Sequence, residues 1–253
     1  MEMNEYQKFI HKSRYARYLE KEGRRETWEE TVQRYCDFWE KPLPDEVKQA
    51  ILDMEIMPSM RALMTSGPAL SRDNMAGYNC SFIAVDHVRA FDENLYVLLC
   101  GTGVGFSVER QFINKLPDVA DSFNNTDTTI VVRDSKIGWA SALRELISLL
   151  YQGRIPEIDY SRIRPAGARL KTFGGRASGP DPLKKLFNQY IRVFKSAAGR
   201  KLTSIECHDL LCFNGEAVVV GGVRRAAELS LSNLTDERMD LPIRIQEWRE
   251  RNI

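Results

Sequence analysis

Residues 80–108 read CSFIAVDHVRAFDENLYVLLCGTGVGFSV, and this stretch decides the fold. Two short apolar runs, residues 80–85 and 104–108, enclose residues 88–100, where apolar side chains recur at helical spacing. The pattern predicts a strand, a helix and a second strand. Parallel strands need such a crossover connection, so the stretch predicts a parallel βα unit and an α/β fold.

The regions on either side continue the alternation. We expect helices within residues 4–40, at 45–54, at 135–151 with Asp134 as N-cap, at 182–197 and at 203–219. Further strands are expected at 128–133 and 227–231. Thr27 with Glu30 and Thr203 with Glu206 have the spacing of capping boxes, in which each residue satisfies a backbone amide of the other.

Composition excludes several classes of protein. Of the 253 residues, 28% are charged and 43% hydrophobic, as in ordinary globular proteins. A net charge of +1 gives no general attraction for nucleic acid. The N-terminal residues are charged throughout and no apolar run is long enough to span a membrane, so we expect a cytoplasmic protein. The five cysteines form no C-x-x-C pair, which argues against a disulfide framework or a metal site.

Glycine-rich segments are the main candidate ligand sites: GTGVG at 101–105, GGRASGP at 174–180 and GGVRR at 221–225. We expect them at strand-to-helix joints, where α/β folds bind ligands. The first falls short of the dinucleotide fingerprint, and tight turns explain it equally well. The second suits a phosphate or a sugar hydroxyl, or is an ordinary loop. Arg224 and Arg225 suit an anion or a carboxylate, or are a surface pair.

Cysteines and histidines leave the chemistry open. Cys80 begins a predicted strand, where a lone cysteine is usually buried packing. His11, His87 and His208 are scattered without ligand spacing or a triad partner, so we expect them to be structural or on the surface. By themselves, the residues indicate an α/β protein that binds a nucleotide.

Nine motifs in their order along the chain resemble the adenosylcobalamin-dependent (class II) ribonucleotide reductases. They are RYARY at 14–18, WEETV at 28–32, MPSMR at 57–61, NCSF at 79–82, GVGFS at 103–107, DSKIGW at 134–139, RPAGA at 164–168, FGGRASGP at 173–180 and GGVRRAAEL at 221–229. The resemblance implies the first half of a ten-stranded α/β barrel at residues 57–234. A small helical region at 1–56 would precede it, and a divergent tail at 235–253 would follow.

The resemblance also implies roles for individual residues. Cys80 is similar to the first of two cysteines that supply the reducing electrons and close into a disulfide. The expected substrate contacts are Ser59, Asn79, Gly103, Gly105 and Arg224, with the two glycines giving clearance for the sugar and the deoxyadenosyl group. The expected effector contacts, at a dimer interface, are Asp86, Arg110, Asp134, Gly222 and Arg225.

The resemblance further implies the reaction and its partners. The family reduces ribonucleotides with a thiyl radical that it generates from adenosylcobalamin, controlled by a deoxynucleotide or ATP effector and re-reduced by a thioredoxin-type protein. The family's Asn-x-Cys-x-Glu motif, which carries the thiyl cysteine and the general base, does not occur in residues 1–253. We therefore expect a split enzyme that needs a separate C-terminal chain. The alternatives are a non-catalytic nucleotide-binding remnant and a truncated gene product, and the sequence does not choose between diphosphate and triphosphate substrates.

Overall fold

The computed structural model describes residues 3–168, 176–218 and 227–239. The chain divides into two compact units. The first consists of Met1–Asn79 with Arg169–Arg176, and the second of Cys80–Ala168 with Ala177–Ile253. The division of the chain at residues 56 and 234 stays a prediction.

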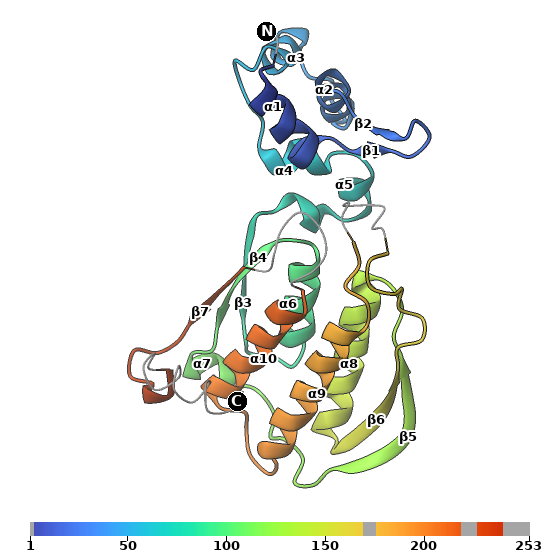
Figure 1. The fold of residues 1–253 in the computed structure, drawn as a ribbon. Coiled ribbons are helices and arrows are strands. Elements are labelled where there is room, and N and C mark those ends of the chain that lie inside the picture. Colours follow the sequence, from blue (N-terminus) through green and yellow to red (C-terminus); the bar gives the residue numbers. More distant parts are fainter. Residues whose placement is uncertain (1–2, 169–175, 219–226, 240–253) are drawn as a thin grey trace. The chain divides into compact units, whose positions relative to one another are not determined.

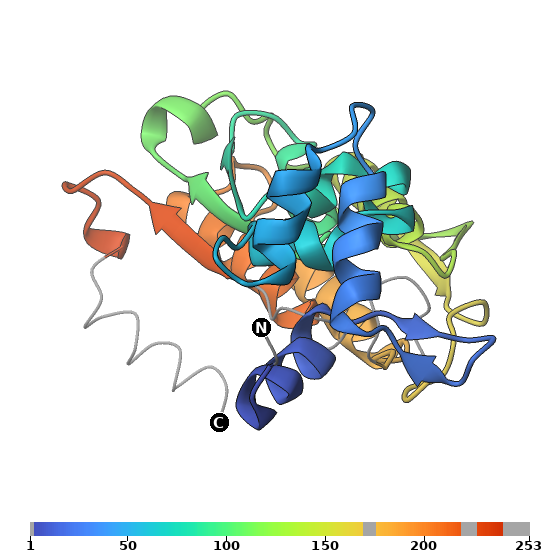
Figure 2. The ribbon, with the colours of Figure 1, turned by 90° about the horizontal axis from the view of Figure 1, so that it is seen from above.

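The first unit is mainly helical, as predicted, and is coloured blue to cyan in Figure 2. Its elements are α1 (Glu5–Ile10), the π-helical turn η1 (His11–Tyr15), β1 (Tyr18–Leu19), β2 (Arg24–Arg25), α2 (Trp28–Asp37), α3 (Asp45–Leu52), α4 (Met60–Thr65), α5 (Pro68–Arg72) and the 3-10 turn η2 (Asn74–Gly77). The antiparallel hairpin β1–β2 was not predicted, because it consists of two residue pairs only.

The start of α2 follows directly from the sequence. The Oγ1 atom of Thr27 accepts from the amide of Glu30 at 3.3 Å, and the Glu30 carboxylate accepts from the amide of Thr27 at 2.7 Å. This confirms the predicted capping box. Side chains at helical spacing then form the core of the unit, which comprises Trp28, Val32, Cys36, Ile51 and Leu63.

A buried ion pair joins Arg34 of α2 to Glu26, and Arg34 also contacts the end of α4. Glu26, only 4% exposed, accepts from Nε and Nη2 of Arg34 at 2.7 and 2.9 Å. Burial raises the pKa of Glu26, but the hydrogen bonds from Arg34 and from the amide of Arg17 outweigh it, so this pKa lies below its ordinary value. Arg34 also donates to the carbonyl of Ser66 and Arg17 to that of Thr65, at 2.8 and 3.0 Å. The two arginines thus satisfy carbonyls at the C-terminal end of α4.

The second unit alternates strands and helices. Its elements are β3 (Cys80–Ala84), α6 (Ala90–Leu99), β4 (Gly103–Ser107), α7 (Arg110–Ile113), β5 (Asn124–Val131), α8 (Lys136–Tyr151), β6 (Arg154–Asp159), α9 (Asp181–Ser196), α10 (Ser204–Ala217), β7 (Glu228–Leu231) and the 3-10 turn η3 (Glu237–Met239). Every predicted strand and helix of this region is present. Strand β6 was not predicted.

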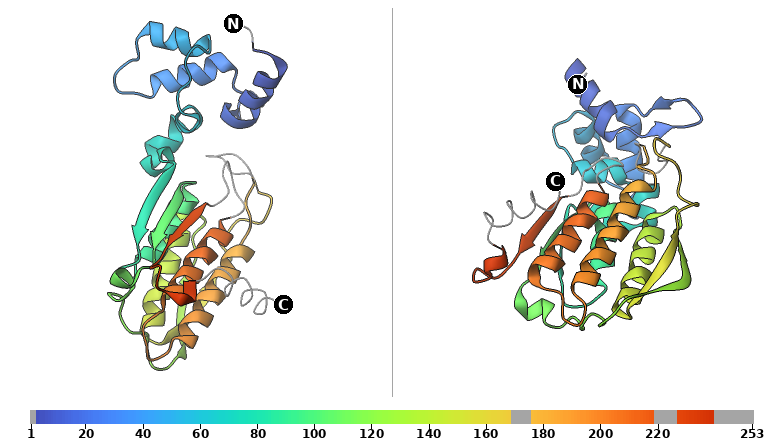
Figure 3. Two further views of the ribbon diagram at one scale, coloured as in Figure 1. Left: turned by 90° about the vertical axis from the view of Figure 1, so that its left-hand side faces the viewer. Right: turned by 60° about the horizontal axis from the view of Figure 1, so that its bottom comes forward.

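All strands of the second unit pair in parallel, which confirms the α/β class. One sheet has the order β3–β4–β7, and β5 pairs with β6 in another. Helices α6, α8, α9 and α10 lie between the two sheets (Figure 1). Figure 3 shows β3, β4 and β7 side by side in its left view and the helix layer beside β5 and β6 in its right view. Their apolar faces form one core, whose largest fully buried members include Phe91, Leu95, Phe106, Leu143, Phe187, Tyr190 and Phe194.

The N-cap of α8 is Ser135, so the prediction of Asp134 was wrong. The Oγ atom of Ser135 accepts from the amide of Gly138 at 2.9 Å, whereas the Asp134 carboxylate accepts from Nε of Arg164 at 2.7 Å. Ser135 has the extended backbone that an N-cap requires. Gly138 needs to be glycine, because a Cβ atom would lie 2.4 Å from the carbonyl oxygen of Arg133.

The first glycine-rich segment, residues 101–105, lies at a helix-to-strand joint and not at the predicted strand-to-helix joint. It connects the end of α6 to β4. The reason is topological, because a crossover helix returns the chain to the amino end of the next parallel strand. Gly101 has φ +78°, which glycine adopts without strain. No helix within the described ranges is long and apolar enough to cross a membrane.

Candidate functional site

Within the described part of the second unit, no helix covers one side of the β3–β4–β7 sheet, and this side carries the predicted reducing cysteine. The parallel register pairs Cys80 with Gly103 and Phe82 with Gly105. On its other side, Gly105 pairs with Leu229. Side chains alternate between the two faces of a sheet, so alternate residues share a face. We call this side the open face, consisting of Cys80, Phe82, Gly103, Gly105, Leu229 and Leu231.

Exposure distinguishes the two faces. On the open face Cys80 is exposed, and Phe82, Leu229 and Leu231 are 57%, 64% and 43% exposed. On the opposite face Val104 and Phe106 are 2% and 0% exposed against the helices. Cys80 is therefore not the buried packing residue that its position in a strand suggests. It lies beside Gly103 of β4, and the neighbouring side chains of the open face are apolar.

The glycines of β4 leave the middle of the open face without side chains. A Cβ atom built on Gly105 would meet its nearest neighbours, in Phe82 and Ser81, at 3.6 Å, an ordinary contact distance. The packing of the described chain therefore leaves room for a side chain at this position. A glycine here keeps the backbone of β4 accessible to a molecule on the open face.

Two predicted substrate contacts belong to the first unit. Ser59 is the N-cap of α4, where its Oγ atom accepts from the amide of Ala62 at 3.1 Å. Because the oxygen accepts, its O–H can still donate to a ligand. The side-chain oxygen of Asn79 accepts from Nε of Arg61 at 3.1 Å, and Arg61 is only 5% exposed. Arg61 therefore holds the side chain that precedes Cys80, a contact that the sequence did not predict.

Of the predicted effector residues, the structure describes Asp86, Arg110 and Asp134, and these three do not lie together within one chain. Asp86 and Arg110 follow the carboxyl ends of the neighbouring strands β3 and β4. Asp86 pairs with Lys115 at 3.2 Å, and Arg110 donates to the carbonyl of Thr235 at 3.1 Å.

Asp134 lies at the other end of the second unit. Lys136 contacts Cys100 at 3.1 Å and Arg144 contacts Asp92 at 2.8 Å, so α8 runs antiparallel to α6. The start of α8 is therefore close to the end of α6, where β4 begins. Gly222, Arg224 and Arg225 lie outside the described residues.

A chain of buried polar groups lies behind the sheet, and sequence reasoning missed it. Glu228 of β7 accepts from Asn94 of α6 at 3.1 Å, and Asn94 accepts from Asn214 of α10 at 2.9 Å. Asn214 also accepts from the hydroxyl of Tyr190 at 3.1 Å. Both asparagines and Tyr190 are fully buried. These groups join β7 to three helices of the core.

The Glu228 carboxyl should make the protein less stable at alkaline pH. Burial raises the pKa of Glu228 from 4.5 to about 7, although the Asn94 amide opposes the shift. Between these values the folded state binds more protons than the unfolded state, so the free energy of unfolding falls as pH rises from about 4.5 to about 7. Glu228→Gln removes this penalty. We expect the variant to be more stable than the parent at pH 8 by up to about 3 kcal/mol, and to differ little near pH 4.

Urea unfolding at pH 4 and pH 8 measures this difference. Glu157→Gln removes an exposed carboxylate from β6 and serves as the control for the loss of one charge. Equal pH profiles for the two variants would contradict the prediction.

His208 is a second feature that the prediction missed. The Nδ1 atom of its ring lies 2.8 Å from Oγ of Ser230 in β7, and Nε2 lies 3.1 Å from Sγ of Cys212. The histidine was expected to have no triad partner, yet the spacing of four residues on a predicted helix already placed Cys212 beside it. His11 is structural as expected, being buried and bonded to Thr31.

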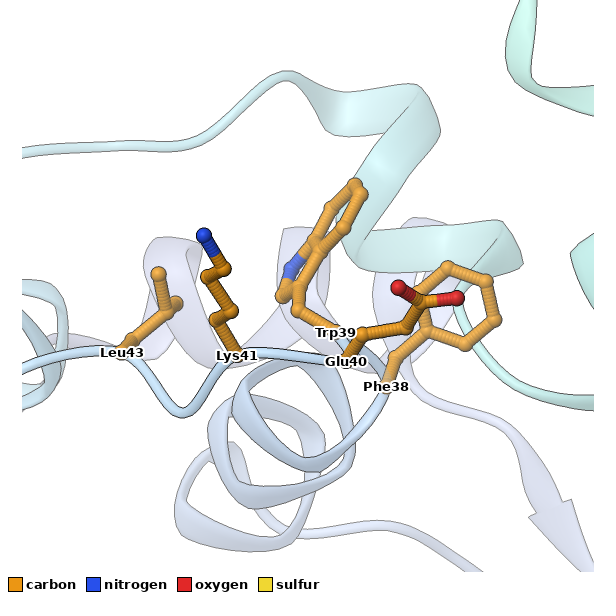
Figure 4. Close-up of a pocket in the computed structure, with 5 residues that line it drawn as sticks. All are labelled: Phe38, Trp39, Glu40, Lys41 and Leu43. Atoms are coloured by element: carbon orange, nitrogen blue, oxygen red, sulfur yellow. The ribbon is translucent and has the colours of Figure 1, made fainter.

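The first unit contains a pocket of its own. An open pocket in the first unit is lined by Phe38, Trp39, Glu40, Lys41 and Leu43 (Figure 4), none of which was predicted to bind a ligand. No three His, Cys, Asp or Glu side chains gather into a metal-binding group within residues 3–168, 176–218 and 227–239.

Comparisons with known proteins agree on one family. Residues 109–194 match the family model of the B12-dependent ribonucleotide reductase insertion domain. The adenosylcobalamin-dependent ribonucleoside-triphosphate reductase of Lactobacillus delbrueckii subsp. bulgaricus is 30% identical over 301 residues, covering 90% of this chain and 41% of the relative. The protein of the same name from Lactobacillus leichmannii is 29% identical with the same coverage.

A solved structure extends this agreement to the fold. The crystal structure of a B12-dependent (class II) ribonucleotide reductase superposes with a TM-score of 0.82 at 26% sequence identity, over 96% of this chain and 44% of that one. The chain is thus similar to the class II ribonucleotide reductases and fits about their N-terminal half, as the motifs predicted. It spans about two fifths of the length of the curated relatives that it matches.

Proposed function

We propose that this chain supplies the N-terminal half of the catalytic barrel of an adenosylcobalamin-dependent ribonucleotide reductase, with Cys80 as a reducing cysteine. The observation that carries the proposal is the open face, where an exposed thiol stands beside the side-chain-free backbone of β4. The names of the relatives favour ribonucleoside triphosphates as the substrates.

Cys80 would provide one of the two thiols that the reaction consumes. Replacing the 2′ hydroxyl of a ribonucleotide by hydrogen takes two electrons and two protons, which two thiols supply as they close into a disulfide and water leaves. The remaining described cysteines are poorly placed to be the second thiol. Cys100 and Cys207 are buried, Cys212 lies on the helix side of the sheet, and Cys36 is buried in the first unit. The second thiol would therefore come from sequence outside these 253 residues.

The substrate would lie along the open face. The hydroxyl of Ser59 and the segment at Asn79 would contact its phosphate and ribose, and Gly103 and Gly105 would let the sugar approach the backbone. Arg224 would contact the base. Apolar neighbours such as Phe82 would exclude water from the thiol, which favours radical chemistry over side reactions.

The same face suits the adenosyl group of the proposed cofactor. The space for a Cβ atom at Gly105 and the apolar side chains around it fit the flat face of an adenine ring. When bound, adenosylcobalamin would supply the radical that starts the reaction. The residues of this chain would bind and enclose that group, and the thiyl cysteine would belong to a separate C-terminal chain.

Regulation would involve two copies of the chain. Asp86 and Arg110 lie at one end of the second unit and Asp134 at the other, so a single effector site containing all three needs a second copy. This supports a dimer with a deoxynucleotide or ATP at its interface, to which Gly222 and Arg225 would contribute. A cytoplasmic thioredoxin-type protein would restore the dithiol by thiol exchange.

Reconstitution tests the proposal. The full chain is mixed with a class II C-terminal chain that contains the Asn-x-Cys-x-Glu motif, together with adenosylcobalamin, a dithiol and a ribonucleoside triphosphate or diphosphate. We expect deoxynucleotide, measured by chromatography, in the complete mixture and none from either chain alone. The dithiol and the cofactor should both be required.

Three results would overturn the proposal. Turnover by this chain alone would show that it needs no second chain. Absence of turnover in a mixture that forms a stable complex and binds ribonucleotide would favour a non-catalytic nucleotide-binding remnant. An insoluble or molten chain that no partner rescues would indicate a truncated gene product.

A further inference from the structure

Helix α10 presents a thiol and an imidazole to each other, away from the open face. Cys212 and His208 are one helical turn apart, and Sγ lies 3.1 Å from Nε2 of the ring. The other ring nitrogen, Nδ1, lies 2.8 Å from Oγ of Ser230 in β7. Cys212 is partly exposed, unlike the buried Cys207.

The surroundings hold the imidazole in one orientation. Ser230 can donate to Nδ1 or accept from it, so its contact persists whether the ring is neutral or protonated. The ring of Phe106 packs against that of His208 at a centroid distance of 5.6 Å and an interplanar angle of 62°. The imidazole can therefore take the proton of the Cys212 thiol without losing a partner on either nitrogen.

A second cysteine on the same helix provides a natural contrast. Cys207 is fully buried, and burial raises its pKa far above the ordinary value. It is therefore held as an unreactive thiol. Cys212 differs from it in both exposure and partner.

Cys212 and Cys80 lie on opposite sides of the β3–β4–β7 sheet. Cys80 belongs to the open face, whereas His208 contacts Phe106 and Ser230, which alternate with open-face residues and point toward the helices. The sheet separates the two thiols. Any chemistry at Cys212 is thus independent of the role proposed for Cys80.

We propose that Cys212 is a second reactive thiol of this protein, activated by His208 and modified by low-molecular-weight disulfides. The Cys212 thiolate attacks one sulfur of the small disulfide and forms a new S–S bond. The original S–S bond breaks, and the leaving thiolate takes the proton that His208 had accepted. The products are one mixed disulfide and one small thiol, with no net change in electrons. The mixed disulfide displaces Cys212 from His208, the residue of α10 that holds Ser230 of β7.

The test treats the full chain with oxidised glutathione at neutral pH and follows each cysteine by peptide mass spectrometry. A Cys80→Ser background removes transfer from the exposed thiol of the open face. We expect a mixed disulfide at Cys212 and none at Cys207 in the folded protein. In His208→Gln, whose amide hydrogen-bonds but takes no proton, the rate at Cys212 should fall at least about tenfold, and its pH dependence should move to higher pH.

Two variants keep the result decisive. If His208→Gln fails to fold by circular dichroism, Ser230→Ala takes its place, because it leaves the imidazole but loosens its orientation; a slower reaction supports the proposal. An unchanged rate in the folded variant would overturn it. So would a Cys80→Ser chain in which Cys212 stays unmodified under conditions that modify Cys80 of the parent completely.

Discussion

Replacing Cys80 by serine should stop multiple turnover of the assembled reductase while cleavage of adenosylcobalamin continues. A serine hydroxyl occupies the same place on the open face but cannot give up electrons to close a disulfide. Deoxynucleotide formation over many cycles should fall to the level of a mixture without this chain. Stopped-flow absorbance of the cobalamin should show cleavage at a rate close to that of the parent.

Cys212→Ser is the matched control for this experiment. It removes a thiol of the same unit from the helix side of the sheet, so multiple turnover should persist. Sustained turnover by Cys80→Ser would refute the reducing role. Loss of cobalamin cleavage together with turnover would instead indicate that the substitution disturbs binding on the open face.

Arg34→Met should destabilise the first unit by about 3–5 kcal/mol, the range expected when one partner of a buried ion pair is removed. Glu26 is only 4% exposed in the parent structure. The variant removes the two N–H donors, Nε and Nη2 of Arg34, that its carboxylate accepts from. The carbonyl of Ser66 loses its donor as well. Urea unfolding by circular dichroism measures the total loss, and hydrogen exchange in α2 locates it.

The double variant Glu26→Gln with Arg34→Met separates charge from packing. A neutral amide at position 26 costs less to bury than an unpaired carboxylate, so the double variant should recover part of the lost stability. A single variant within 1 kcal/mol of the parent, or a double variant less stable than the single one, would contradict this reading of the pair.

Local signals in the sequence predicted much of the fold. The capping boxes at Thr27 and Thr203 were readable because both partners lie within one helical turn, and the structure confirms each. Strand β6 was missed because its sequence, RIPEID, contains a proline and charged residues that are uncommon in strands. The N-cap of α8 was misplaced by one residue because aspartate and serine, both favourable caps, are adjacent there.

The candidate site, too, was predictable only where its residues are related by a local pattern in the sequence. The positions of Cys80, Gly103 and Gly105 on one face follow from strand alternation once the register is known, and the register required the structure. The polar chain from Glu228 to Asn94 joins residues 134 positions apart, so no local pattern could indicate it. The contact between His208 and Cys212 could have been predicted from the sequence, since their spacing alone places them on one helix face.

The position of β7 beside β4 has a consequence for how the chain folds. In the order β3–β4–β7, one edge of β4 stays unpaired until β7 forms, and β7 lies more than a hundred residues later in the chain. The contact between Asn94 and Glu228 spans a similar distance in sequence. Contacts of such long range close large loops and form slowly. Strand β7 also packs on α10, which precedes it in the chain. Folding of the second unit should therefore finish at its C-terminal strand, and until then the edge of β4 is open to mispairing with other chains.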